Sequence, residues 1–292
     1  MNKYAIIAAT PKCASTSVFH YLRNHPEISP SFEKEPNFFK KQENFIGDPS
    51  IEDIKRSYDR IFLSPSVANV HLDGSVTYGN KEENIKRIAQ VLNNDDVKVI
   101  FTTRDPFERM YSSYVMKIRN GLVKKEISFD EYVKELHNGD ALRRIQSSYF
   151  ERYKMISQYL GEENIIVCEL ELLQRDPGYE MKRISEFLAI DAEYYDNFTF
   201  HHHNIGVDKR SKVYGIYTYI KRKIKRKTPF LHSFISIIYF FFFSKIKNIP
   251  AIEKNKRKHF VESDVYAYLQ KIYSEDIALD KKELGIGGYW NC

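Results

Sequence analysis

A set of anion-binding side chains directly follows an apolar run near the start of the chain. The run at residues 5–9 is followed by Lys12 and then by the hydroxyl side chains of Ser15, Thr16 and Ser17. This order predicts a strand, a tight loop and a helix that begins near Ser15. The first N–H groups of a helix have no partner within it and carry partial positive charge, which favours a bound phosphate. The alternative is an ordinary helix start whose hydroxyls only cap these N–H groups.

The loop differs from the phosphate loop of the common nucleotide hydrolases. That loop reads GxxxxGK[ST], with the lysine directly before the hydroxyl. Here the loop contains no glycine, and Lys12 comes three residues before Ser15. No later apolar strand ends in an Asp suited to magnesium, so hydrolysis of ATP or GTP is disfavoured.

A second pair of anion-binding residues follows the most continuous apolar run, residues 97–103. Arg104 ends this run, Pro106 suits the first turn of a helix, and Ser112 comes two turns further along that helix. In open α/β sheets, ligands bind outside the carboxyl ends of the strands. Because a guanidinium can bind a phosphate with two hydrogen bonds, Arg104 and Ser112 are predicted to form a second phosphate site.

The remaining pattern predicts the elements that position these residues. Helices are expected over 51–64 and 82–92, and a short strand that ends at a turn is expected within 70–75. Continuous apolar strands separated by helices are typical of a parallel sheet with right-handed crossovers. The predicted fold class is therefore α/β, a P-loop-like three-layer fold with a central parallel sheet flanked by helices.

A charged segment lies between two prolines, Pro30 and Pro36. It contains Glu33, Lys34 and Glu35, and the prolines predict an extended or turn-like connection. Taken alone, these charges are interpreted as a solvated surface cluster, whose ion pairs contribute little to stability.

Taken together, the motifs resemble those of the sulfotransferases that use 3′-phosphoadenosine 5′-phosphosulfate (PAPS). Pro11-Lys-x-x-Ser-Thr-Ser17 is similar to their 5′-phosphosulfate loop, and Arg104-Asp-Pro-x-Glu-Arg-x-Tyr-Ser112 to their 3′-phosphate motif. Residues 33–39 resemble the Lys-Glu-x-x-Phe-Phe element of the heparan-sulfate-type and bacterial carbohydrate sulfotransferases. The resemblance covers roughly residues 3–212 and returns at Leu284–Trp290.

The resemblance implies transfer of a sulfonate from PAPS to a hydroxyl or amine of a carbohydrate acceptor (polysaccharide, oligosaccharide or glycolipid). The reaction would be an in-line displacement that releases 3′-phosphoadenosine 5′-phosphate (PAP) and needs no metal. Glu35 is the implied general base, with Glu33 as its rival, and Lys12 assists the leaving phosphate. The implied donor-binding residues are Lys12, Cys13, Ala14, Ser15, Thr16, Ser17, Arg104, Ser112 and Arg210.

The implied contacts to substrate are Glu33, Lys34, Asn37 and Tyr149, and for Tyr149 packing in the core is an equal alternative. Three positions depart from the family pattern. Ala14-Ser15 stands for Gly-Thr, Asn37 for a His, and Lys40 for an acidic residue. The first reduces the backbone freedom of the loop, and the other two affect the acceptor side.

The last third of the chain changes in composition. The segment 221–227 holds six basic residues, which account for the formal net charge of +6, and the apolar run 229–243 has 15 residues. A membrane-spanning helix needs about 20. Either 221–247 contacts an anionic membrane surface, or the run is a core helix or oligomer contact. The predicted division is a core at 1–212, an insert at 213–250 and a C-terminal helix and tail at 251–292.

The other compositional features limit the partners and the compartment. The cysteines are three in number and far apart, which favours a reducing compartment. Without a recognisable secretory signal, we expect a cytoplasmic protein, with the inner face of the membrane as a second possibility. Neither a metal site at His201–His203 nor nucleic-acid binding is expected. The competing functions are a P-loop-type nucleotide kinase and a membrane-attached nucleotide-binding protein without turnover.

Overall fold

The structure is a computed structural model. It describes residues 2–8, 10–63, 68–124, 126–137, 148–201 and 264–290. The chain divides into two compact units. The first comprises Met1–Pro106, Ser147–His203 and Glu275–Cys292, and the second comprises Phe107–Gln146 and Asn204–Ser274. The predicted insert at 213–250 lies outside the described residues, so the division into core, insert and tail stays a prediction.

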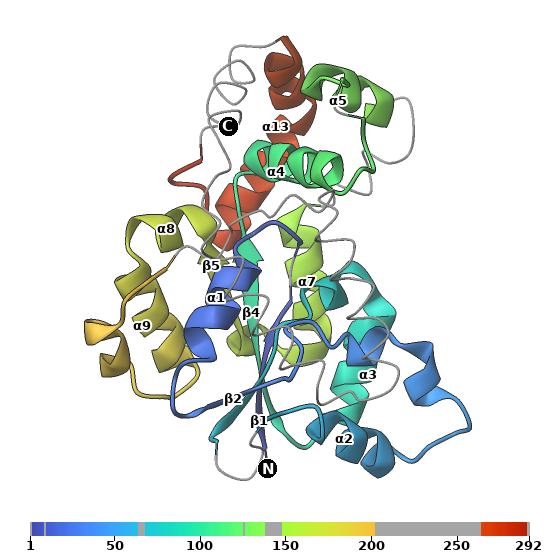
Figure 1. Cartoon of the computed structure of the whole chain (residues 1–292), viewed down its shortest axis with the longest axis vertical. Helices are drawn as coiled ribbons and strands as arrows, with labels where there is room; N and C mark the ends of the chain where they lie inside the picture. The colour runs from blue at the N-terminus through green and yellow to red at the C-terminus, as the bar shows by residue number, and fades with distance from the viewer. Residues whose placement is uncertain are drawn as a thin grey trace. The chain divides into compact units, whose positions relative to one another are not determined.

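A five-stranded parallel sheet forms the centre of the first unit (Figure 1). The order β2-β3-β1-β4-β5 places β1 in the middle, and the chain crosses from one side of β1 to the other between β3 and β4. The strands are β1 (Lys3–Ile7), β2 (Ile28–Pro30), β3 (Val70–Asp73), β4 (Asp96–Thr103) and β5 (Ile165–Glu169). The carboxyl ends of β3, β1 and β4 therefore lie side by side at the point where ligands bind in this kind of sheet.

Helices cover both faces of this sheet (Figure 1). One face packs against α1 (Ser15–Leu22), α8 (Leu170–Arg175) and α9 (Pro177–Phe187). Its apolar side chains include Ile7, Val18, Leu72, Ile166 and Ile184, all buried. The α/β class with a central parallel sheet flanked by helices is thus confirmed.

The opposite face packs against α2 (Ile51–Asp59), α3 (Glu82–Val91) and α7 (Tyr149–Leu160). This side of the core is rich in aromatic rings. Tyr4 of β1 lies 5.6 Å from Tyr58 of α2 between ring centroids, and Phe101 of β4 lies 6.4 Å from Tyr149 of α7. Alternate residues of a strand face opposite sides, so β1 contributes Tyr4 to this layer and Ile7 to the other.

Two details differ from the prediction. The helix expected over 51–64 ends at Asp59, because residues 61–63 pair with the backbone beside β2. Phe32 N–H donates to Ile61 O (2.9 Å), and Leu63 N–H donates to Pro30 O (3.1 Å). The strand β2 itself was not predicted, since it has only three residues and ends in a proline that is tolerated at a sheet edge. Short 3-10 helices occupy Phe38–Lys40 (η1), Gln42–Phe45 (η2), Val76–Asn80 (η3), Glu162–Asn164 (η4) and Glu193–Asn197 (η5).

The described part of the second unit consists mainly of helices. It contains α4 (Pro106–Arg119) from Phe107 onward, α5 (Phe129–His137) and the first half of α13 (Asp264–Leu284). The rings of Tyr114 and Phe129 lie 5.2 Å apart, and the Tyr114 hydroxyl donates to Ile127 O (2.7 Å). No helix among the residues that the structure describes is long and apolar enough to cross a membrane.

Candidate active site

The loop after β1 has a backbone shaped for anion binding. Lys12 and Ala14 adopt the left-handed conformation, with φ of 77° and 63°. Outside glycine this costs about 1–2 kcal/mol per residue, and such strain often marks a functional site. Left-handed residues before a helix turn successive N–H groups toward one point, which forms a concave anion site. The geometry of the loop therefore suits an anion at the start of α1.

The helix start is not the capped one of the alternative interpretation. Ala14 occupies the N-cap position of α1, no side chain caps the helix, and its first turn contains no acidic residue. Ser15, Thr16 and Ser17 follow the cap and belong to the first turn. By contrast, Ser50 caps α2 by accepting from Asp53 N–H, as the residue type at that position predicts.

Arg104 reaches the loop from the neighbouring strand. It follows the carboxyl end of β4, and its guanidinium Nη1 donates to Lys12 O at 3.4 Å. The two segments that the sequence singled out for phosphate binding are thus in direct contact. Next to Arg104, the backbone N–H of Asp105 donates to Glu171 Oε1 (3.1 Å), and burial raises the pKa of the Glu171 carboxyl.

Lys34 connects the loop to the candidate base. Its Nζ lies 2.7 Å from Glu35 Oε1 and 3.4 Å from Ser15 Oγ. The side chains of Lys34 and Glu35 are 20% and 39% exposed, so the ion pair lies at the edge of the core and is open to solvent on one side. The charges interpreted as a surface cluster therefore belong to the same site as the loop. Glu33, the rival base, is half-buried, and its carbonyl accepts from Ser31 Oγ (2.7 Å).

A buried carboxylate at the end of β3 holds this segment in place. Asp73 is fully buried and accepts from Tyr58 OH (3.1 Å), Tyr78 OH (3.0 Å) and Ser75 N–H (2.8 Å). Burial raises the pKa of Asp73, although these donors act in the opposite direction. Ser75 Oγ accepts in turn from Asn37 N–H at 2.9 Å. Two hydrogen-bonded steps thus connect the buried core to the residues beside Glu35.

Asn37 is committed to the protein itself. It has φ of 53°, its Nδ2 donates to Glu35 O (3.0 Å), and its Oδ1 accepts from Thr77 Oγ1 (2.9 Å). An asparagine adopts the left-handed conformation more easily than most residues. These contacts shape the backbone around Glu35, while a contact between Asn37 and a substrate stays a prediction.

Tyr149 lies behind the loop. Its side chain is buried, its hydroxyl donates to Arg104 O at 2.8 Å, and the same oxygen lies 3.5 Å from Cys13 Sγ. Its ring contacts Phe101 and Trp290, at 6.4 and 6.0 Å between centroids. The core-packing alternative thus describes the ring, while the hydroxyl contacts both anion-binding segments.

The sulfotransferase domain family matches residues 3–278, nearly the whole chain. The chain belongs to this family. The predicted sulfotransferase family is thereby confirmed, and the kinase alternative is not supported.

Two relatives illustrate the range of the sulfotransferase family. The chain is 28% identical over 210 residues to the membrane-associated sulfotransferase kil1 of Dictyostelium discoideum. That alignment covers 70% of this chain but 42% of the relative, so it spans less than half of that longer protein. A sulfotransferase from Alicyclobacillus acidocaldarius has the same fold, with a TM-score of 0.53, 20% identity, and coverage of 81% of this chain and 96% of its own.

Two predicted donor residues of the sulfotransferase are not joined to the loop by the described contacts. Ser112 lies half-buried on α4 in the second compact unit, so its pairing with Arg104 stays a prediction. Arg210 lies outside the described residues. Among the residues that are described, no group of three His, Cys, Asp or Glu side chains is arranged to hold a metal ion.

Sequence reasoning missed two residues that position α7 against the loop. Arg152 Nη1 donates to Thr10 Oγ1 (2.7 Å) and to Asn80 Oδ1 (3.1 Å). Asp280 of α13 accepts from the N–H groups of Tyr149 (3.1 Å) and Phe150 (2.8 Å) at the start of α7. The three-residue spacing of Tyr149 and Arg152, which places both on one face of a helix, was the available signal.

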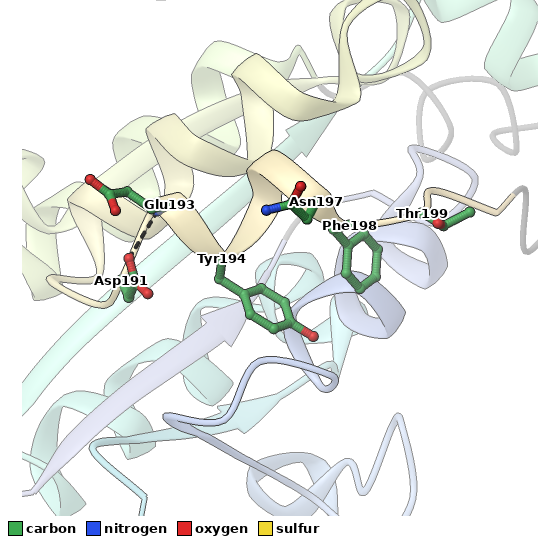
Figure 2. Close-up of a pocket in the computed structure, with 6 residues that line it drawn as sticks. All are labelled: Asp191, Glu193, Tyr194, Asn197, Phe198 and Thr199. Carbon is green, nitrogen blue, oxygen red and sulfur yellow. Dashed lines mark hydrogen bonds between the residues drawn. The ribbon is translucent and has the colours of Figure 1, made fainter.

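An open pocket of about 440 Å³ lies elsewhere in the sulfotransferase, and Figure 2 shows its six lining residues. It lies near the C-terminal end of α1, where the hydroxyl of its lining residue Tyr194 donates to Asn24 O (2.8 Å). The eight residues of α1 span about 12 Å, so this pocket is separate from the loop at the helix start. Its lining residues are Asp191, Glu193, Tyr194, Asn197, Phe198 and Thr199.

Proposed function

We propose that this sulfotransferase moves a sulfonate from PAPS to a hydroxyl or amine of a carbohydrate, with Glu35 as the general base. The observation that carries the proposal is the position of Lys34 Nζ, 3.4 Å from Ser15 Oγ of the donor loop and 2.7 Å from the Glu35 carboxylate. The Glu35 carboxylate, the proposed general base, is thus separated by one side chain, that of Lys34, from the first turn of α1, where the sulfonate donor would bind.

The residues around the loop fit a donor with several negative charges. Lys12, Lys34 and Arg104 supply positive charge, and the uncapped start of α1 supplies backbone N–H groups. We assign Lys12 and the hydroxyls of residues 15–17 to the 5′-phosphosulfate, and Arg104 to the 3′-phosphate. Ser112 and Arg210 are proposed as further donor contacts on the family pattern.

The reaction is a direct transfer. The acceptor oxygen or nitrogen forms a bond to sulfur while the bond from sulfur to the bridging oxygen breaks, and the electron pair stays on the 5′-phosphate of PAP. Glu35 takes the proton that the acceptor loses, and Lys12 stabilises the charge that develops on the leaving oxygen. As in phosphoryl transfer, positioning and electrostatics supply most of the catalysis.

The choice of a carbohydrate acceptor has a separate basis. It rests on the similarity of residues 33–39 to the element found in the heparan-sulfate-type and bacterial carbohydrate sulfotransferases. In this chain the 33–39 segment carries the Lys34–Glu35 ion pair and contacts the donor loop. A panel of polysaccharides, oligosaccharides and glycolipids, incubated with PAPS and read by mass spectrometry, would identify the acceptor class; sulfation of none of them would refute it.

The donor and the base are tested separately. Calorimetry should give tighter binding of PAP than of ATP, and the opposite order would reject the assignment of the donor site. Glu35→Gln should abolish transfer from radiolabelled PAPS while it leaves PAP affinity within about twofold. Glu33→Gln is the matched control, because Glu33 lies two residues away. Full activity of Glu35→Gln together with loss in Glu33→Gln would exchange the two roles.

We further propose that the basic segment 221–227 and the apolar run 229–243 attach the enzyme to an anionic membrane surface. The composition supports this proposal, and so does the similarity to kil1 of Dictyostelium discoideum, a membrane-associated sulfotransferase. Flotation with vesicles that contain anionic lipid should recover the wild-type chain. Neutralising the six basic residues of 221–227 should abolish this recovery, whereas unchanged flotation would contradict the proposal.

A further inference from the structure

The hydroxyl of Tyr149 contacts both anion-binding segments. It donates to Arg104 O at 2.8 Å, and Cys13 Sγ lies at 3.5 Å. A phenol has one proton to donate. With that proton directed to Arg104 O, the thiol of Cys13 is the donor in the second contact. One buried oxygen thus joins the loop that contains Lys12 to the end of β4 that carries the Arg104 guanidinium.

The position of Tyr149 is itself fixed from two sides. Asp280, 3% exposed, accepts from Ser148 Oγ and from the N–H groups of Tyr149 and Phe150, which anchors the first turn of α7. One turn further along, Arg152 donates to Thr10 Oγ1 at the start of the loop. The hydroxyl therefore projects from a helix that has little freedom to follow the loop if the loop moves.

We propose that Tyr149 is a positioning residue for the sulfonate donor. Its hydroxyl holds the loop and the end of β4 in the binding arrangement before PAPS arrives. The inference rests on the proposed donor site. Its physical basis is preorganisation: Lys12 and Ala14 are held at positive φ, and a loop without this hydrogen bond would have to be ordered by the ligand. That ordering is subtracted from the binding free energy.

If Tyr149 only packed in the core, its replacement would give a different outcome from that of a positioning role. Helix α7 also provides a control residue, Tyr153. Tyr153 also packs its ring on Phe101, at 6.1 Å between centroids, one turn after Tyr149. Among the described residues its hydroxyl has no hydrogen bond to the loop or to β4. Replacing either tyrosine by phenylalanine keeps the ring in the core, so only Tyr149→Phe removes a contact to the donor segments.

The experiment compares wild type, Tyr149→Phe and Tyr153→Phe by calorimetry with PAP, by steady-state kinetics with PAPS, and by thermal unfolding. Tyr149→Phe should weaken PAP binding and raise the KM for PAPS about fivefold, which is the effect of one lost hydrogen bond of ordinary strength. The KM for the acceptor should stay within about twofold. Tyr153→Phe should leave PAP affinity unchanged.

The outcomes separate this inference from the proposed function. If wild type does not bind PAP, the donor assignment fails. If wild type binds PAP and the two variants behave alike, or if Tyr149→Phe lowers only the unfolding temperature, the positioning role is overturned. Should Tyr149→Phe fold poorly, Cys13→Ala removes the other partner of the hydroxyl and should weaken PAP binding about twofold or more; unchanged PAP affinity would count against the role.

Discussion

Gly74 is the point at which a single methyl group should move the candidate base. It follows β3 directly, and a Cβ at this position would lie 2.6 Å from Lys34 O and 2.7 Å from Phe19 Cδ2. Real Cβ atoms essentially never come this close to other heavy atoms. One of the two atoms is a backbone carbonyl, which cannot rotate away as a side chain can. Gly74→Ala is therefore expected to push the Lys34–Glu35 segment away from β3.

The magnitude follows from the contact. Ordinary packing begins at 3.4 Å, so the carbonyl of Lys34 must move by about 0.8 Å, the difference between 3.4 and 2.6 Å. Overpacking of this kind costs about 1–3 kcal/mol, and the lower backbone entropy of unfolded alanine offsets up to about 1 kcal/mol. A displacement near 1 Å at a reacting group can reduce the rate about 100-fold. We expect kcat to fall between about 10- and 100-fold.

The assay measures kcat with saturating PAPS, PAP affinity by calorimetry and the unfolding temperature. Gly288→Ala is the control, because a Cβ there meets nothing within 4 Å. The reasoning predicts a large loss of kcat, a fall of a few degrees in unfolding temperature and a smaller effect on PAP affinity. If Gly74→Ala retained wild-type kcat, the position of Glu35 would not depend on the packing of Lys34 against β3.

Three further changes test buried hydrogen bonds in and around the site. Burial raises the pKa of Asp73, so the native state binds its proton more readily than the unfolded chain, and the free energy of unfolding falls as pH rises from about 3.8 through the raised pKa. The wild type should therefore lose stability relative to Asp73→Asn over that range in urea titrations; a constant difference between them would contradict this. Asp280→Ala leaves the buried donors at the start of α7 without their acceptor, and the free energy of unfolding should fall by about 2–4 kcal/mol; an unchanged urea midpoint would refute the capping role. Arg152→Ala should weaken PAP binding a few-fold through Thr10, and calorimetry that gives wild-type affinity would exclude that coupling.

Local sequence patterns were sufficient to predict those strands and helices for which the pattern allowed only one interpretation. The continuous apolar run that ends at Arg104 is a central strand, and the loop that ends at Ala14 does open a helix at Ser15. The pattern failed where distant pairing decides the conformation. Residues 61–63 continue an apolar helical spacing, yet their backbone pairs with residues 30–32. No propensity within 51–64 encodes that partner, because it lies about 30 positions earlier in the chain.

The same distinction applies to the site. Lys12 and Arg104 could be assigned from their positions at strand ends, because parallel strands bring their carboxyl ends to one edge. Lys34 could not be assigned in this way, since charged residues between prolines are usually solvated, and only the family resemblance implied its contact to substrate. Its role follows from β3 lying beside β1: this pairing brings Gly74 against the Lys34 carbonyl and the Lys34 ammonium to Ser15. In the proposed reaction that packing positions Glu35, so a substitution at Gly74 should alter catalysis although it changes no charged side chain.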